Sequence, residues 1–165
     1  MASTQAAIRD RVRTLIEAIT PTSLSGDKFR SSRNEAGADF MAWAEAHPTA
    51  ALRRFQARFD GSEDPPEVSN TDTDLRHATL VVLIAYPHTA RYGADQAMDR
   101  DDVIQQDFKK IEQAIGIYGR ANFSGSHDAT PLGNEGAPMK ETERGVACDF
   151  LRITARFSFY ATVGA

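Results

Sequence analysis

The residues best suited to catalysis lie in a glycine-containing stretch, where two serines precede a histidine and an aspartate. Ser124 and Ser126 carry hydroxyl groups of the kind that act as nucleophiles. The adjacent His127 and Asp128 have the residue types of a general base and of the carboxylate that orients it. A small hydrolase that uses His127 and Asp128 is therefore one hypothesis. Because adjacent loop residues seldom hold the fixed geometry that nucleophilic catalysis needs, we do not expect an enzyme.

The other chemically active residues do not have the spacing of a known metal or nucleotide site. The four histidines are scattered, and no His-Glu-x-x-His, Cys-x-x-Cys or Gly-x-Ser-x-Gly sequence gathers them with a metal or a nucleophile. Three aspartates, Asp99, Asp101 and Asp102, are candidate ligands for a divalent metal, but capping and the positive end of a helix already explain them. The single cysteine, Cys148, is expected to be a small buried hydrophobic residue. We predict no catalytic residue, no metal and no cofactor.

The composition is that of one ordinary globular domain. The chain has 165 residues, a formal net charge of -4 and 25% charged residues. This length is enough to bury a core without disulfides or a metal, and this charge argues against a protein that coats nucleic acid with a basic face. Residues 1–10 lack the features of a secretion signal, and no run of roughly 18 apolar residues occurs. We predict a single assembly domain at 1–165, made in the cytoplasm, with no membrane partner.

Three segments have the periodicity of amphipathic helices. Residues 3–19 place five apolar residues on one face. Residues 35–46 are predicted to form a short helix that ends before Pro48, and residues 99–115 a longer helix with an acidic start. The polar residues 20–34 are predicted to be a connection with a short extended part.

Two segments alternate apolar and polar side chains with a period of two, which predicts strands with one buried face. They are residues 54–59 and residues 151–159. The polar side of each strand carries a pair of arginines. These arginines are Arg54, Arg58, Arg152 and Arg156. Because the two strands have the same design, we predict that they are neighbours in the sheet.

The last predicted strand, 144–160, changes phase within its length. Before residue 150 the apolar residues occupy even positions, and from residue 151 they occupy odd positions. The adjacent apolar residues Phe150 and Leu151 therefore mark either a bulge or a change of environment. We expect the part before this point to contact a partner and the part after it to lie in the sheet core.

Residues 79–86 form a continuous apolar run, which predicts a central strand covered on both faces. The run closes with Tyr86-Pro87-His88, at a place where open sheets often carry functional side chains. Turn formation after the strand explains the proline equally well, so we predict no active site there.

Two long polar segments separate these elements. Residues 60–74 hold six acidic residues, no basic residue and a Pro-Pro pair, which predicts an acidic loop or an extended arm in solvent. Residues 116–143 hold five glycines and two prolines, and this segment is much longer than the usual connection of about 4–6 residues. We predict a long Gly-rich loop there that orders against another subunit. The whole pattern predicts an α+β fold, with a small, mostly antiparallel sheet packed by two or three helices and with long loops.

This order of elements resembles that of the tail terminator and related neck proteins of tailed bacteriophages. The residues that carry the resemblance are the apolar strand at 78–86, the helix at 99–115 with its acidic start, and the alternating strand at 149–160. The likeness is one of layout and extends across most of the chain. It implies a structural virion protein of the tail or neck, and it brings no catalytic residues with it.

The resemblance implies a homo-oligomeric ring, commonly a hexamer, at the head-proximal end of the tail tube. Such a ring ends tube growth and joins the tail to the head, so the expected partners are further copies of itself, the tail-tube protein and a head-completion or stopper protein. DNA would pass through the channel without specific binding, which suits the acidic balance of the chain. Another neck position, such as a stopper or a tail-completion subunit, fits the same resemblance.

The charge pattern suggests how such subunits meet. Two predicted strands carry arginines and one segment carries carboxylates, and head-to-tail contacts join unlike surfaces. We hypothesise that the arginines meet carboxylates of a neighbouring subunit, whereas pairing within one chain or plain solvation explains them equally well. The residues of this hypothetical interface are Arg54, Arg58, Asp60, Glu63, Asp64, Glu67, Arg152 and Arg156.

Overall fold

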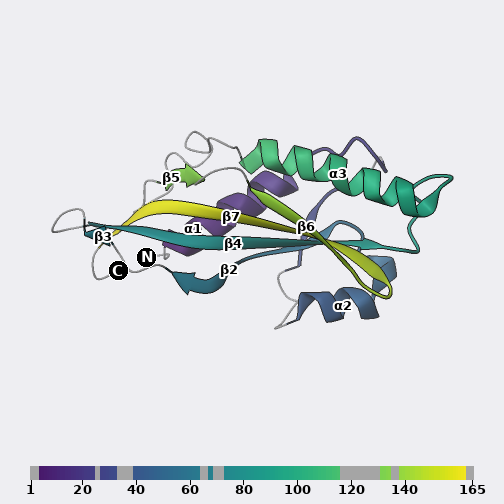
Figure 1. Cartoon of the computed structure of the whole chain (residues 1–165), viewed down its shortest axis with the longest axis horizontal. Coiled ribbons are helices and arrows are strands. Elements are labelled where there is room, and N and C mark those ends of the chain that lie inside the picture. The colour runs from purple at the N-terminus through teal and green to yellow at the C-terminus, as the bar shows by residue number, and fades with distance from the viewer. Residues whose placement is uncertain are drawn as a thin grey trace.

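A seven-stranded sheet with helices on both faces organises the chain (Figure 1). The computed structural model describes residues 4–24, 27–32, 39–63, 67–68, 73–115, 131–134 and 138–162. The helices are α1 (Thr4–Glu17), α2 (Phe40–Ala46) and α3 (Gln96–Ile115), with a short 3-10 helix, η1 (Pro48–Ala50). The strands are β1 (Arg30–Ser31), β2 (Arg54–Glu63), β3 (Glu67–Val68), β4 (Thr73–Pro87), β5 (Pro131–Asn134), β6 (Met139–Arg144) and β7 (Cys148–Thr162). The predicted α+β class is confirmed.

The helices form where apolar periodicity predicts them, and their ends have local causes. α1 packs its apolar face against the main core. α2 begins after Asp39, whose Oδ1 accepts the N–H of Ala42 at 3.0 Å, and it ends at His47 before the proline. Residues 35–38 of this predicted helix lie outside the described residues. α3 begins at Gln96, nearly one turn earlier than predicted.

The sheet is antiparallel except at one edge. Its strand order is β1-β2-β4-β7-β5, with β3 added to β4 and β6 added to β7, and β1 alone runs parallel to its neighbour. β4 lies between β2 and β7, so the prediction that the two arginine-bearing strands are neighbours is wrong. The register nevertheless places Gln56, Leu83 and Arg152 in one cross-strand row. The polar sides of β2 and β7 therefore share one face of the sheet.

Apolar side chains are buried on both faces of the sheet, which explains the phase change in β7. The main core lies between the sheet and the helices α1 and α3, and Leu151 belongs to it. A smaller core lies under α2 and contains Phe40, Phe150 and Cys148. Because the register of β4 with β7 continues without a shift, the adjacent residues Phe150 and Leu151 mark a change of environment and not a bulge. Before this point, Cys148 and Phe150 are buried in the smaller core, whereas Arg144 and Val146 are exposed, so the expected partner contact stays a prediction for the exposed residues.

The segment predicted to be an acidic loop or arm contains strands. β2 continues to Glu63, β3 forms at Glu67–Val68 and β4 begins at Thr73, so the prediction of a loop is wrong for these parts of 60–74. Residues 64–66 and 69–72 lie outside the described residues. The strands pair with the long β4, and such pairing overrides the weak strand propensity of acidic residues and glycine.

The Gly-rich segment and the last strand also differ from prediction. β5 and β6 form within 116–143 and pair with β7, so the prediction of a loop is wrong there, while 116–130 and 135–137 lie outside the described residues. The predicted strand 144–160 is divided by a turn, where the N–H of Gly145 donates to the carbonyl oxygen of Cys148 at 2.8 Å. β6 and β7 therefore form a hairpin (Figure 1).

Candidate interaction face

The side of the sheet that faces α2 is partly uncovered within the described part of the chain. On the opposite side, Leu80, Val82 and Ile84 of β4 are fully buried by α1 and α3, whereas Thr79 and Val81 on the α2 side are partly exposed. We call the uncovered area the open face. Its residues are Gln56, Arg58, Asp60, Thr79, Val81, Arg152, Thr154 and Arg156. The period-two alternation of the strands brings these side chains to one side.

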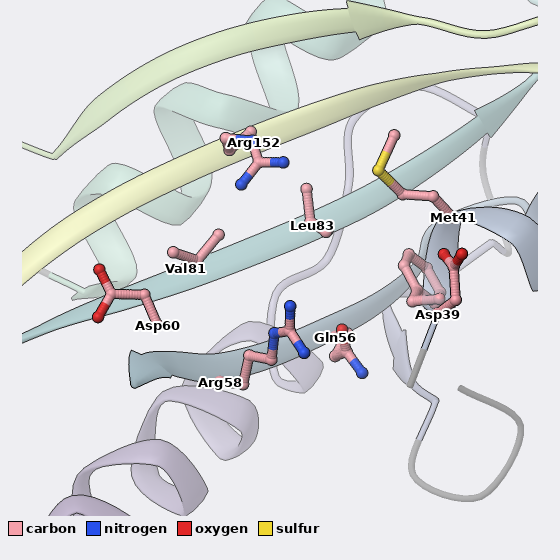
Figure 2. Close-up of a pocket in the computed structure, with 9 residues that line it drawn as sticks. Asp39, Met41, Gln56, Arg58, Asp60, Val81, Leu83 and Arg152 are labelled. Carbon is pink, nitrogen blue, oxygen red and sulfur yellow. The ribbon is translucent and has the colours of Figure 1, made fainter. Parts of the chain in front are cut away.

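A pocket of about 170 Å³ opens on this face beside the start of α2 (Figure 2). We call it the α2 pocket. Val81 and Leu83 of the central strand β4 form its floor, and Met41 of α2 stands at one end. Arg58 on β2 and Arg152 on β7 lie on either side of this floor (Figure 2). The other lining residues are Asp39, Phe40, Gln56 and Asp60.

One of the two pocket arginines has a partner within its own chain. The Nε of Arg152 donates to Oε1 of Glu143 on β6 at 2.6 Å, so pairing within the chain is confirmed for this residue. Both side chains are about one-third exposed, and an ion pair of this kind contributes about 0–1 kcal/mol. Arg152 can therefore exchange this carboxylate for another at little cost. Arg58, on the other side of the pocket, is exposed.

The structure gathers some of the predicted interface residues and separates others. Those that line the α2 pocket are Arg58, Asp60 and Arg152. Arg156 lies further along the open face, opposite Thr79 of β4. Arg54 lines a different hollow, beside η1. The side chains of Glu63 and Glu67 and the whole of Asp64 lie outside the described residues.

The lining of the α2 pocket suits binding more than catalysis. Guanidinium groups bind carboxylates and phosphates through paired, charge-assisted hydrogen bonds, and the apolar floor accepts an apolar side chain. Among the described residues that line it, there is no histidine and no serine, threonine or cysteine that could act as a nucleophile. The pocket therefore presents an apolar floor between charged groups.

A second polar cluster, which the sequence did not predict, ties the turn end of the β6–β7 hairpin to α3. The carboxylate of Asp149 is 1% exposed and accepts hydrogen bonds from Nε2 of His88 at 2.9 Å, Nε of Arg100 at 2.8 Å and Nη1 of Arg144 at 3.1 Å. Arg144 also pairs with Asp101 of α3 at 3.2 Å. The cluster joins the end of β4, the start of β7 and the first turns of α3, so it orients the hairpin. Its signal in the sequence is an aspartate at an odd, core-facing position of the alternating strand.

The environment of Asp149 lowers its pKa. Burial by itself raises the pKa of this carboxyl group, but hydrogen bonds from His88 and Arg100 and the positive charge of Arg100 lower it by more. The net result is a pKa below the ordinary value of an aspartate. Asp149 is therefore ionised in the folded protein and holds the cationic groups around it.

A third polar cluster is enclosed in the main core. The guanidinium group of Arg53 donates from Nε and Nη2 to both oxygens of Asp107 at 2.8 and 2.9 Å, and the hydroxyl of Tyr86 donates to Oδ2 at 2.7 Å. Burial, followed by the charge of Asp107 and this hydrogen bond, raises the pKa of Tyr86 above its ordinary value. Arg53 adopts a φ of 55°, a left-handed conformation that a non-glycine residue seldom adopts. The sequence signal is Asp107 within the apolar stripe of α3, but nothing in the sequence pairs it with Arg53.

The remaining residues that the sequence suggested for catalysis or metal binding do not form such a site within the described part of the chain. Ser124, Ser126, His127 and Asp128 lie outside the described residues. Among the residues that are described, no group of three or more His, Cys, Asp or Glu could hold a metal ion. Cys148 is buried as predicted, and burial, followed by the charges of Glu45 and Asp149, raises the pKa of its thiol to about 12. Its thiol is therefore protonated and unreactive at neutral pH.

No protein-family model matches the chain. No curated protein matches it either. None of the described helices is both long and apolar enough to span a membrane.

Proposed function

We propose that this protein is a structural subunit of the neck of a tailed bacteriophage, which forms a ring at the head-proximal end of the tail. In this role it ends tail-tube growth and joins the tail to the head. The observation that carries the proposal is the open face. This surface combines partly exposed apolar residues with arginines on a rigid sheet, and no described helix covers it beyond α2.

The composition of the open face supports an assembly role. Oligomer interfaces combine an apolar centre with a polar rim, and arginine is enriched there. The α2 pocket has this composition, with Val81 and Leu83 at its floor and Arg58 and Arg152 at its sides. The carboxylates of Asp39 and Asp60 belong to the same lining and add to its polar rim.

The arginines of the open face are proposed to meet carboxylates of a neighbouring subunit, including those of residues 60–74. Such a contact joins unlike surfaces and repeats around a ring. The other proposed partners are the tail-tube protein and a head-completion or stopper protein. DNA passes through the channel without specific binding, because an acidic channel repels phosphate groups.

A related position in the neck is the alternative. A stopper or a tail-completion subunit needs the same kind of subunit contact, so the open face supports these roles as well. Electron microscopy of the purified protein, alone and mixed with tube subunits, distinguishes them. A terminator forms rings and caps tubes, whereas a stopper or a tail-completion subunit does not cap them, and monomers that never cap a tube contradict the proposal.

Charge reversal tests the role of the open face directly. The variant Arg152→Glu with Arg156→Glu should remain folded by circular dichroism but fail to form the ring in sedimentation or microscopy. The matched control is Arg91→Glu with Lys109→Glu, which changes the net charge equally at exposed positions away from the open face. Rings that form normally in the first variant would contradict the proposed interface.

A further inference from the structure

The tip of the β6–β7 hairpin presents an apolar side chain to solvent. Val146 in this turn is 95% exposed, more than the other large hydrophobic residues found exposed in the described part of the chain, Met98 and Met139. A single exposed apolar residue is common on protein surfaces. The backbone of the turn that carries Val146 is held by hydrogen bonds, so the exposure of this side chain is a fixed feature of the surface.

Several hydrogen bonds fix this tip against α2 and β4. The N–H of Ala147 donates to Oε2 of Glu45 on α2 at 2.6 Å, and its carbonyl oxygen accepts the N–H of His88 at 2.8 Å. The turn is closed between Gly145 and Cys148. A Cβ atom at Gly145 would collide with the carboxylate of Glu45 and would lie 2.7 Å from the carbonyl oxygen of Cys148. The valine is therefore a pre-organised knob, and a rigid knob loses little conformational entropy on binding.

The tip and the α2 pocket lie at the two ends of α2. Glu45, near the end of this helix, contacts the tip, whereas Asp39 and Met41, at its beginning, line the pocket. A helix of 7 residues is about 10 Å long. A side chain held at one end of this helix cannot fill a pocket at the other end of the same molecule, so the pocket is left open to the same side chain of another copy.

We propose that Val146 of one subunit inserts into the α2 pocket of the next subunit. The apolar floor of Val81 and Leu83 accepts the valine side chain. The carboxylate of Glu45 lies beside the knob. The pocket carries the carboxylates of Asp39 and Asp60 as well as the exposed guanidinium of Arg58, and the contact pairs Glu45 with Arg58. A second copy of this chain is the occupant that supplies both the apolar and the acidic part.

The contact is heterologous, because the tip of one subunit meets the pocket of another. Contacts of this kind repeat from subunit to subunit and close into a ring when the rotation allows. The inference rests on the proposed ring and names its subunit contact. It also gives α2 a role, since this short helix both braces the knob and walls the pocket.

Disulfide trapping tests the contact with the full-length chain. In the variant Val146→Cys with Gln56→Cys, mild oxidation should give covalent oligomers larger than a dimer on non-reducing gels. The matched control is Val146→Cys with Gln113→Cys, because Gln113 is exposed on α3 away from the pocket, and it should give dimers at most. The buried Cys148 adds no cross-link to either variant.

A second variant removes the knob without adding a thiol. Val146→Asp should weaken oligomer formation at least tenfold in sedimentation experiments, whereas Met98→Asp, at another exposed apolar position, should leave it unchanged. If the wild-type protein forms rings but the Val146–Gln56 pair gives no larger species than the control, the inference is wrong and the proposed function stands. If the wild-type protein stays monomeric and never caps tubes, both fail.

Discussion

Replacing Asp107 with alanine tests whether the enclosed charge pair holds the main core together. The carboxylate receives two hydrogen bonds from Arg53 and one from Tyr86, and both charged side chains are at most 1% exposed. Asp107→Ala removes the carboxylate and leaves the guanidinium group in the core with the carbonyl oxygens of Ser23 and Asp27. Loss of one member of a buried pair costs about 3–5 kcal/mol, because the remaining charge is uncompensated. We expect the free energy of unfolding to fall by this amount.

This loss is large compared with the stability of an ordinary domain. The free energy of unfolding of such domains is about 5–15 kcal/mol, so the variant should be marginally folded. For a domain of this size, each kcal/mol changes Tm by about 2–4 °C. The expected decrease in Tm is therefore about 6–20 °C.

Urea unfolding measures the effect in the intact chain. The fluorescence of the single tryptophan, Trp43, and far-ultraviolet circular dichroism report the transition. Asp102→Ala removes an exposed carboxylate from the same helix and should change the free energy of unfolding by less than about 0.5 kcal/mol. Tyr86→Phe removes one hydrogen bond and should cost about 0.5–1.5 kcal/mol.

A double variant separates the charge from the contacts. Arg53→Met with Asp107→Leu leaves no unpaired charge, so it should be more stable than Asp107→Ala alone. The reasoning is refuted if Asp107→Ala costs less than about 1 kcal/mol, within the range of an ordinary hydrogen bond, or if the double variant is the less stable of the two.

Three further predictions concern the turn end of the β6–β7 hairpin. The pKa of Asp149 is lowered in the folded protein, so its contribution to stability is fully present above the unfolded-state pKa of about 3.9 and is lost as the pH falls through the folded-state pKa. The difference in the free energy of unfolding between wild type and Asp149→Asn should therefore shrink below about pH 4, and a constant difference would contradict this. The thiol of Cys148, with its pKa raised to about 12, should resist alkylation at pH 8 in the folded protein and react once urea unfolds it; rapid labelling without urea would show an open tip. Gly145→Ala should lower the free energy of unfolding in urea by about 1–3 kcal/mol, because the added Cβ has no room beside Glu45 and the Cys148 carbonyl oxygen. The control Ala97→Gly, at an exposed position of α3, measures the ordinary effect of a glycine-alanine exchange.

Periodicity predicted the elements whose burial is decided locally. The apolar stripe of α1 and the alternation of β2 and β7 each follow from one buried face, and these elements form as predicted. The continuous apolar run of β4 predicted a strand covered on both faces, but Val81 is partly exposed. α2 covers a limited part of that face, and the extent of such cover depends on tertiary packing that no local pattern encodes.

The missed features depend on contacts between distant segments. β5 and β6 have weak strand signals of their own and form because β7 offers a partner on its free side. Asp149 lies next to the phase change of the strand, and its side chain is buried on the same side of the sheet as Leu151. Its partners His88, Arg100 and Arg144 come from three other elements, and sequence spacing could not bring them together.

For the candidate site, the sequence predicted the arginines but not the pocket. Arg58 and Arg152 were identified from alternation on two separate strands, and β4 between them supplies the apolar floor. The pocket also needs the start of α2, whose place on this face follows from the smaller core around Phe40 and Phe150. Of the acidic residues proposed as partners, Asp60 lines the pocket. The side chains of Glu63 and Glu67 and the whole of Asp64 lie outside the described residues.

The pairing of β4 with β7 also requires two segments far apart in the chain to meet during folding. The two strands are far apart in the chain and pair along their whole length, and such non-local pairing is slow because a large loop must close first. The β2–β4 hairpin can form earlier, but one edge of β4 then remains without a partner. Since β7 supplies Arg152 and Arg156, the open face is complete only when this last strand docks. A chain in which β7 has not yet paired with β4 therefore lacks the surface that subunits would use.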